Sequence, residues 1–281
     1  MDVLETIEQM RAACQAAKRQ GKRLGFVPTM GALHEGHLSL VRAAKARSNV
    51  VAASIFVNPT QFGPNEDFSK YPRSFEKDRE LLENEGVKLL FAPSVQEMYP
   101  EGAVTFVTVE GLSQRLCGKS RPGHFRGVTT VVSKLFHITQ PDLAFFGQKD
   151  AAQVAIIRRM VLDLNLGVEI VGCPIVREAD GLAMSSRNAY LSPKERKSAL
   201  VLSRSLAQVK RLFDQGERIG TALVAGGRQA FAEEPSVRLD YFEIVNPETL
   251  EPVEHMSNPA LVAVAGFVGG TRLIDNIVLA T

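Results

Sequence analysis

One apolar run constrains the fold more than any other feature of this 281-residue chain. From Val50 to Val57 the only polar side chain is that of Ser54. A strand that is apolar on both of its faces must be covered on both, which is typical of a parallel sheet packed between helices. This run therefore predicts a central strand of an α/β domain.

Similar short apolar runs alternate with helical patterns along the first two thirds of the chain. In 123–137, apolar residues recur at helical spacing, as in Val128, Val131, Val132 and Leu135. The alternation predicts an α/β fold with a Rossmann-like, mostly parallel sheet flanked by helices. The first 23 residues predict an amphipathic helix. Residues 104–109 predict either an extra strand or an excursion, that is, an irregular segment outside the sheet. The expected strands are 23–28, 49–57, 88–93, 142–146 and 168–172.

The pattern changes after residue 176. Residues 193–213 predict one long amphipathic helix that begins near Pro193, and 219–233 predicts a second. Strand-like segments follow at 237–245, 261–267 and 272–280. Helices followed by antiparallel strands indicate a smaller α+β domain. We therefore expect two tightly joined domains, 1–176 and 177–281.

Composition excludes several classes of protein. With 33 basic and 31 acidic residues the net charge is +2, so the basic excess of a nucleic-acid-binding protein is missing. No stretch is apolar enough to span a membrane, and the acidic N-terminus does not resemble a signal peptide. The three cysteines form no CxxC pair, which predicts buried free thiols in a reducing compartment. We expect a cytoplasmic protein without nucleic-acid or membrane partners.

Polar segments follow the predicted strands, where an open α/β sheet binds its ligands. In PTMGALHEGH (28–37), a Gly-bearing turn leads into a helix start at which His34 and His37 face the same way. Free N–H groups and the dipole of such a helix start favour a phosphate. The alternative is a capping or metal-binding pair of histidines. Neither GxGxxG nor a P-loop is present.

Two further segments carry uncharged and charged candidates. Asn58 and Gln61 follow the most apolar strand and suit a hydroxyl, a carboxylate or an amine, although Asn-Pro-Thr is also ordinary turn chemistry. Lys149 follows another strand and suits phosphates. Asp150 suits Mg²⁺ carried by a nucleotide or, as the simpler alternative, a helix cap, and Gln153 lies one turn further.

The fourth segment lies at the junction of the two expected domains. Ser185, Ser186 and Arg187 can all donate hydrogen bonds to phosphate oxygens, but a Ser-Ser-Arg loop is also often plain solvated surface. Among the remaining histidines, His124 in GHFRG is a weaker candidate for the site. His137 is expected to be a core or edge histidine.

Taken together, these segments closely resemble the pantothenate synthetase family of the HxGH nucleotidyltransferase superfamily. The resemblance is dense over about the first 190 residues and loose after them. It implies ATP, R-pantoate and β-alanine as substrates and a pantoyl-adenylate intermediate. It also implies Mg²⁺ dependence, a cytoplasmic homodimer, and a C-terminal lid domain that covers the nucleotide.

The resemblance also implies roles for individual residues. His37 matches the family's proposed proton donor. From their own chemistry, His34, Lys149 and Arg187 are expected to be further catalytic groups and Asp150 the metal ligand. Gln61 and Gln153 match the family's pantoate ligands, and the match places Gln61 near β-alanine as well. Asn58 is a further candidate for substrate binding because it follows the end of a predicted strand. The residues expected to bind ATP are Met30, Gly31, Ala32, Leu33, His34, Glu35, Gly36, His37, Gly147, Gln148, Lys149, Asp150, Val176, Met184, Ser185, Ser186 and Arg187.

The expected mechanism needs no protein nucleophile. The pantoate carboxylate attacks the α-phosphorus of ATP among positive groups that include both histidines, and the amine of β-alanine then expels AMP. The loop from Gly63 to Tyr71 and the C-terminal domain are candidate lids. The alternatives are an adenylyl- or cytidylyltransferase, a class I aminoacyl-tRNA synthetase, and a regulatory module that binds ATP without turnover.

Overall fold

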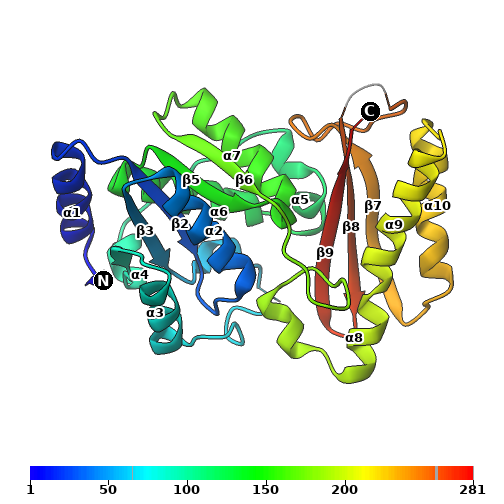
Figure 1. Ribbon diagram of the computed structural model, residues 1–281, viewed down its shortest axis with the longest axis horizontal. Coiled ribbons are helices and arrows are strands. Elements are labelled where there is room, and N and C mark those ends of the chain that lie inside the picture. Colours follow the sequence, from blue (N-terminus) through cyan, green and yellow to red (C-terminus); the bar gives the residue numbers. More distant parts are fainter. Residues whose placement is uncertain (65, 257–258, 281) are drawn as a thin grey trace.

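The computed structural model describes residues 1–64, 66–256 and 259–280, which form two sheets with their helices (Figure 1). The larger sheet has six strands in the order β1-β4-β3-β2-β5-β6, and every neighbouring pair is parallel. Its strands are β1 (Asp2–Leu4), β2 (Leu24–Thr29), β3 (Val50–Ile55), β4 (Leu89–Phe91), β5 (Leu143–Gly147) and β6 (Glu169–Cys173). The predicted parallel sheet is therefore confirmed.

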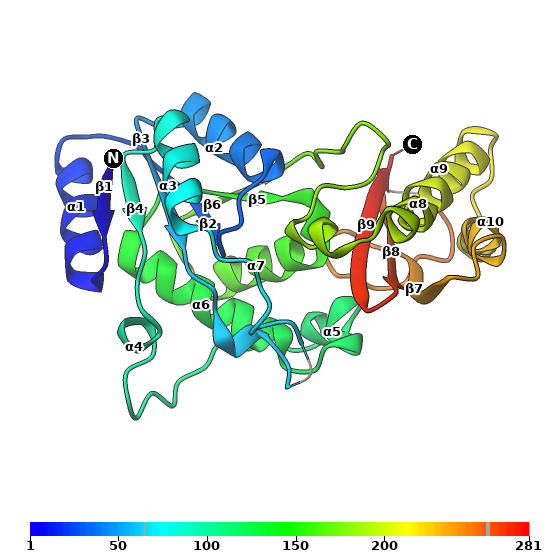
Figure 2. The same ribbon diagram turned by 90° about the horizontal axis from the view of Figure 1, so that it is seen from below.

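Helices cover both faces of this sheet (Figure 2). On one face lie α1 (Ile7–Arg19), α6 (His124–Thr139) and α7 (Ala151–Asp163), which share a core with Phe26 and Phe146. On the other face, α2 (Glu35–Arg47) and α3 (Phe75–Asn84) share a core with Val27 and Phe145. Successive strand residues thus enter opposite cores, which explains why β3 reads as one continuous apolar run.

The strand order places a switch point between β2 and β5. From β2 the chain moves outward to β3 and β4, and then returns to the other side of β2 as β5. Ligands of open α/β sheets bind beyond the carboxyl ends of strands at such a point. The two segments that meet there begin at Met30 and Gln148.

The smaller sheet is antiparallel, in the order β7-β8-β9. Its strands are β7 (Val237–Val245), β8 (Ala260–Val268) and β9 (Thr271–Leu279), as predicted to within a few residues. One face packs on α9 (Val201–Asp214) and α10 (Gly220–Ala232). Side chains of the other face, including Leu261 and Ala263, join the core of α6 and α7. The expected domain boundary at 176 and 177 lies in the connection between the two sheets.

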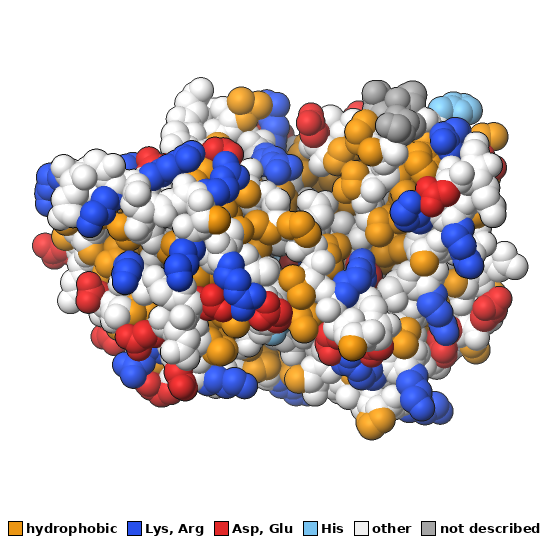
Figure 3. Space-filling view, viewed as in Figure 1, with side chains coloured by type: hydrophobic (Ala, Val, Ile, Leu, Met, Phe, Trp, Pro, Cys, Tyr) orange, Lys and Arg blue, Asp and Glu red, His pale blue; other side chains and the backbone are white. Residues whose placement is uncertain are grey.

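Short elements complete the chain. They are α4 (Val95–Met98), α5 (Cys117–Ser120) and α8 (Pro193–Ala199), and the 3₁₀ helices η1 (Pro59–Gln61), η2 (Leu112–Gln114), η3 (Gln148–Asp150) and η4 (Ser186–Tyr190). In the part of the chain that the structure describes, no helix is long and apolar enough to cross a membrane. On the face drawn in Figure 3, both Lys and Arg and Asp and Glu side chains are found on the left and the right parts of the molecule.

Two expectations need correction. Residues 2–4 are not helical but pair with β4, because the helix starts only after Thr6, whose side chain and that of Gln9 form a capping box. The helix predicted over 193–213 is interrupted at Leu200, whose N–H bonds the carbonyl of Lys197 in a tightened last turn.

Residues 104–109, for which we expected either a strand or an excursion, form no strand. Its backbone is tied instead to side chains of α6: the N–H of Val107 donates to Thr130 Oγ1 at 3.0 Å, and Thr129 Oγ1 donates to the Val107 carbonyl at 2.6 Å. The segment is thus the excursion that was the other expected possibility.

Candidate active site

The turn after β2 is held by a carboxylate from α3. Asp78 is buried, and its two oxygens accept the N–H groups of Ala32 and Leu33, each at 2.8 Å. Ala32 lies in the left-handed region with φ 51°, which is unfavourable for a residue with a Cβ. Asp78 therefore fixes a strained turn at the start of the site. Sequence reasoning missed it, because only its burial distinguishes it from the other acidic residues of α3.

The two histidines lie side by side at the start of α2. Their ring centroids are 4.2 Å apart, which confirms that they face the same way. His34 Nδ1 accepts the N–H of Gly36 at 3.1 Å, and His37 Nδ1 accepts the N–H of His34 at 3.3 Å. A Cβ on Gly36 would stand 2.9 Å from the His34 ring, so any other residue at this position would displace that ring.

These hydrogen bonds and the surroundings determine the protonation state of both rings. Burial, reinforced by Lys149, lowers the pKa of His34 to about 4. Burial, followed by the neighbouring His34, lowers the pKa of His37 to about 3. Both rings are therefore neutral at pH 7, and because each Nδ1 accepts a hydrogen bond, the proton sits on Nε2. This corrects the expectation that they are positive groups: they are neutral donors.

The turn after β5 carries Lys149 and Asp150. Lys149 Nζ lies 3.7 Å from Asp150 Oδ2. Asp150 occupies the N-cap position of α7, but its side chain makes no capping hydrogen bond. The simpler alternative for Asp150, a helix cap, is thus wrong as far as its side chain is concerned, and the carboxylate is available for other chemistry.

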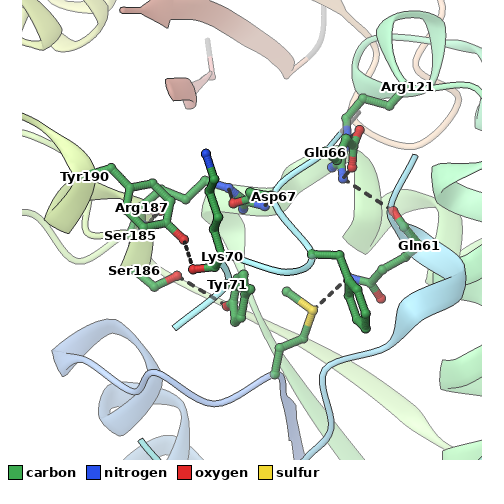
Figure 4. Close-up of polar contacts among 12 residues, drawn as sticks. Gln61, Glu66, Asp67, Lys70, Tyr71, Arg121, Ser185, Ser186, Arg187 and Tyr190 are labelled. Atoms are coloured by element: carbon green, nitrogen blue, oxygen red, sulfur yellow. Dashed lines mark hydrogen bonds and ion pairs between the residues drawn. The ribbon is translucent and has the colours of Figure 1, made fainter. Parts of the chain in front are cut away.

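The Ser-Ser-Arg segment approaches from the connection between the sheets (Figure 4). Ser185 Oγ accepts the N–H of Arg187, and Ser186 Oγ lies 3.3 Å from the hydroxyl of Tyr71. The guanidinium of Arg187 binds both oxygens of Asp67 at 2.9 Å. The segment is therefore joined to the loop from Gly63 to Tyr71, in which Asn65 lies outside the described residues.

The uncharged groups follow β3. Gln61 Nε2 donates to Met30 Sδ at 3.0 Å, and its Oε1 accepts from Asn58 Nδ2 at 3.1 Å. Asn58 is fully buried and bonds also to the Gly127 carbonyl and the Tyr99 hydroxyl. A Cβ on Gly127 would stand only 2.6 Å from Gln61 Cα, so this glycine lets the Gln61 backbone lie against α6. Asn58 is thus a support for Gln61.

His124 belongs to the same group. Its Nδ1 lies 2.8 Å from the Gln61 carbonyl and its Nε2 3.0 Å from Arg121, which also pairs with Glu66. Burial, followed by Arg121, lowers the pKa of His124 to about 4, so the ring is neutral at pH 7. The weaker candidate thus lies in the site, and GHFRG was its sequence signal. His137 is exposed at the edge of α6, with Nδ1 2.7 Å from the Ser133 carbonyl.

Two adjoining cavities connect these segments. The inner one, of about 230 Å³, is lined by both histidines, Met30, Asn58, Gln61, Gly147, Val176, Met184 and Ser186. The outer one, of about 850 Å³, extends to β7, β8 and β9. The residues that line both are Arg121, His124, Lys149, Asp150, Gln153, Ser185 and Arg187. Most predicted site residues thus converge on one continuous space.

Five predicted ATP-binding residues do not line either cavity: Gly31, Ala32, Leu33, Glu35 and Gln148. The first three form the turn that Asp78 holds. The Glu35 side chain is drawn to the surface by Arg42, with which it forms an ion pair, and the Gln148 carbonyl accepts a hydrogen bond from Asn276.

The charges at the cavities suit a polyanion next to an uncharged polar ligand. Lys149, Arg121 and Arg187 are cations that line both cavities, and the neutral Nε2–H groups of the histidines are further donors for anionic oxygens. Among the described residues, no cluster of three or more His, Cys, Asp or Glu side chains could hold a metal on its own. Asp150 can contribute one carboxylate, which suffices when substrate oxygens complete the shell of Mg²⁺.

The chain is similar to known proteins over almost its whole length. The model of the family "Pantoate-beta-alanine ligase" matches residues 2–278. The pantothenate synthetase of Acidobacterium capsulatum is 63% identical, with 98% of this chain and 96% of that protein covered. The crystal structure of pantothenate synthetase from Thermus thermophilus is 50% identical, covers 99% of both chains and superposes with a TM-score of 0.94.

A third relative was crystallised with ligands. The pantoate-beta-alanine ligase of Francisella tularensis, solved in complex with beta-gamma ATP and beta-alanine, is 35% identical. The superposition covers 99% of this chain and 97% of the Francisella tularensis chain, with a TM-score of 0.80.

Proposed function

Because the chain belongs to the pantoate–β-alanine ligase family and is an ATP-dependent ligase of pantothenate biosynthesis, we propose that it joins R-pantoate to β-alanine in these two cavities, in two steps. In the first step, the pantoate carboxylate attacks the α-phosphorus of ATP and pyrophosphate leaves. In the second step, the amine of β-alanine attacks the acyl carbon and AMP leaves. The observation that carries the proposal is the convergence of the two-histidine turn and the Lys149 turn at the switch point of the sheet.

The nucleotide would lie across this switch point. Gly147, Val176 and Met184 line the inner cavity with little polarity and suit a base and ribose. Lys149, Ser185 and Arg187 line both cavities and suit the phosphates. Arg187 would exchange the carboxylate of Asp67 for phosphate oxygens, since Asp67 holds its Nε and Nη2 groups in the structure.

The histidines would act as neutral hydrogen-bond donors. Charge builds up on the phosphoryl oxygens as the carboxylate attacks, and donors that are already in place stabilise it without reorganisation. The two rings are fixed by their Nδ1 bonds, which leaves the Nε2–H groups as the donors. His37 remains the proposed main catalytic donor, with His34 beside it.

The acyl acceptor and the amine would occupy the inner cavity. Gln61 and Gln153 would bind pantoate through their amides, and Gln61 also lies where β-alanine would attack. Asn58 would act indirectly, since its side chain is engaged by Gln61 and the Gly127 carbonyl. The neutral His124 would support Gln61, since its Nδ1–H donates to the Gln61 carbonyl and its Nε2 accepts from Arg121. No step needs a covalent bond to the protein.

Mg²⁺ would bind between Asp150 and the phosphates. The donor set fits, because one carboxylate and substrate oxygens are the usual ligands of a nucleotide-borne Mg²⁺. The ion would neutralise phosphate charge and orient the leaving pyrophosphate. Lys149, 3.7 Å from the same carboxylate, would share the charge compensation.

We further propose a cytoplasmic homodimer of two domains, 1–176 and 177–281, with the second as a lid. All three cysteines are free and buried, which suits a reducing compartment. The exposed apolar side chains of Val104 and Phe106 in the excursion suit an interface with a second copy. The outer cavity between the two sheets is the space that a lid would close.

An omission assay tests the proposed reaction. Pyrophosphate release from ATP should require R-pantoate but not β-alanine, and AMP release should require both. An adenylyl- or cytidylyltransferase would release pyrophosphate with a phosphorylated alcohol instead, and an ATP-binding regulatory module would release none. Pyrophosphate release that needs β-alanine would contradict the two-step order.

A further inference from the structure

Asn276 connects the two sheets of the molecule. It lies in β9, its side chain is 3% exposed, and it takes part in the wall of the outer cavity. Its Nδ2 donates to the carbonyls of Gln148 at 2.9 Å and Lys149 at 3.0 Å. These carbonyls belong to the turn after β5 that carries Lys149 and Asp150.

Packing alone does not account for an amide at this place. A buried amide is costly unless it is hydrogen-bonded, whereas other buried positions of β9, such as Leu273 and Leu279, are apolar. Both amide protons of Asn276 go to the turn, and its Oδ1 accepts no hydrogen bond from the residues that the structure describes. The side chain is therefore explained by the turn that it holds.

The turn has few anchors of its own. The 3₁₀ helix η3 has only three residues, and Asp150 makes no capping hydrogen bond to α7. Without the amide, the carbonyls of Gln148 and Lys149 would lose these two bonds inside the protein. A shift of about 1 Å in a catalytic group can cost about 100-fold in rate.

The residue before Asn276 fixes β9 to the connection between the sheets. Asp275 is buried and accepts hydrogen bonds from Arg177 Nη1 at 2.7 Å and Nη2 at 2.9 Å, and it also accepts the N–H of Asn276. Arg177 directly follows Val176 and donates to the Gly181 carbonyl as well. Asp275 and Asn276 thus hold the connection and the turn from neighbouring positions of one strand.

We propose that Asn276 is a positioning residue that supports the binding and reaction of ATP. It couples the position of the C-terminal sheet to the geometry of Lys149 and Asp150. The inference rests on the proposed role of Lys149 at the phosphates. By thermodynamic reciprocity, ATP that binds the ordered turn also stabilises the docked position of β9.

The direct test is the variant Asn276→Leu, which keeps the volume and removes both donors. Its kcat/KM for ATP should fall about 10- to 100-fold, while the KM for β-alanine changes less than about twofold. Val278→Thr, at an exposed position of the same strand, is the matched control and should leave both values unchanged. Asn276→Ala serves if the leucine does not fit. Equal losses for both substrates would indicate a general structural role and overturn the proposal.

A double-mutant cycle separates this inference from the function on which it rests. If Asn276 acts through the turn, Asn276→Leu should cost several-fold less in a Lys149→Ala background than in the wild type. If the rate losses of the two single variants multiply in the double variant, the positioning role of Asn276 is overturned, while the proposed function stands. Normal ATP use by Lys149→Ala itself would remove Lys149 from the phosphates, and the inference with it.

Discussion

Asp67 binds the guanidinium of Arg187 through both carboxylate oxygens, with Nε–Oδ2 and Nη2–Oδ1 distances of 2.9 Å. Both side chains are about one quarter exposed. The pair joins the loop after β3 to the segment between the sheets, at the place proposed for the phosphates. The Asp67 carboxylate thus occupies the guanidinium of Arg187, to which a phosphate of ATP would bind.

Asp67→Asn should therefore improve the use of ATP. The amide competes less well than a carboxylate for Arg187 and does not repel phosphate, so the KM for ATP should fall about two- to fivefold, as expected for a partly exposed ion pair. Steady-state kinetics with ATP as the varied substrate would show it, with Ser69→Ala in the same loop as the control. A higher KM would mean that Asp67 assists nucleotide binding.

His37→Ala should slow the first step and leave the fold intact. Loss of one donor to a transition state typically costs about 10²- to 10³-fold in rate. Pyrophosphate release in a single turnover, with saturating ATP and R-pantoate, is the measurement. A near-normal rate would remove His37 from the chemistry and leave His34, whose ring lies beside it, as the remaining donor.

Acid should destabilise the protein through its buried histidines. The folded-state pKa values of His34, His37 and His124 are lowered to about 4, 3 and 4. Between these values and the unfolded pKa near 6.5, the unfolded chain binds more protons, so stability falls as the pH drops through this window. Each histidine contributes at most about 1.4 kcal/mol per pH unit.

Denaturant unfolding between pH 7.5 and 5 would measure this slope. In His37→Gln, which carries no titratable group at this position, the slope should be shallower than in the wild type. An unchanged slope would show that His37 does not titrate with a lowered pKa.

Asp150→Asn should raise the Mg²⁺ requirement. Loss of the one carboxylate that can share the ion with the phosphates should increase the Mg²⁺ concentration for half-maximal rate by about tenfold or more. Titration of MgCl₂ at fixed ATP measures this. Asp163→Asn, at the other end of α7 and paired with Arg159, is the control and should not respond. The same Mg²⁺ dependence in both variants would place the ion elsewhere.

Sequence patterns predicted the elements whose signal is local and strong. The apolar run at 50–57 became β3, and the stripe at 128–136 became the buried face of α6. The three residues of β1 are too few for a periodic pattern, and they are a strand only because β4 lies beside them. The break at Leu200 depends on one tightened turn, which the amphipathic pattern crosses without a change.

The same distinction between local sequence signals and contacts of the folded chain holds for the site. His34, His37, Lys149 and Arg187 follow strands in sequence, and the switch point brings them together. Asp78 and Asn276 act on turns that lie 45 and 127 residues away from them, so no local pattern points to either. The lowered pKa values of the histidines also follow from burial in the folded protein, which the sequence does not contain.

The most direct test of the two-step account follows one oxygen atom. With R-pantoate labelled with ¹⁸O in its carboxylate, attack of that carboxylate on the α-phosphorus transfers a labelled oxygen to AMP. The account predicts one ¹⁸O in each AMP released, detected by mass spectrometry after a full turnover with β-alanine. Unlabelled AMP would contradict the adenylate and, with it, the proposed use of the converging turns.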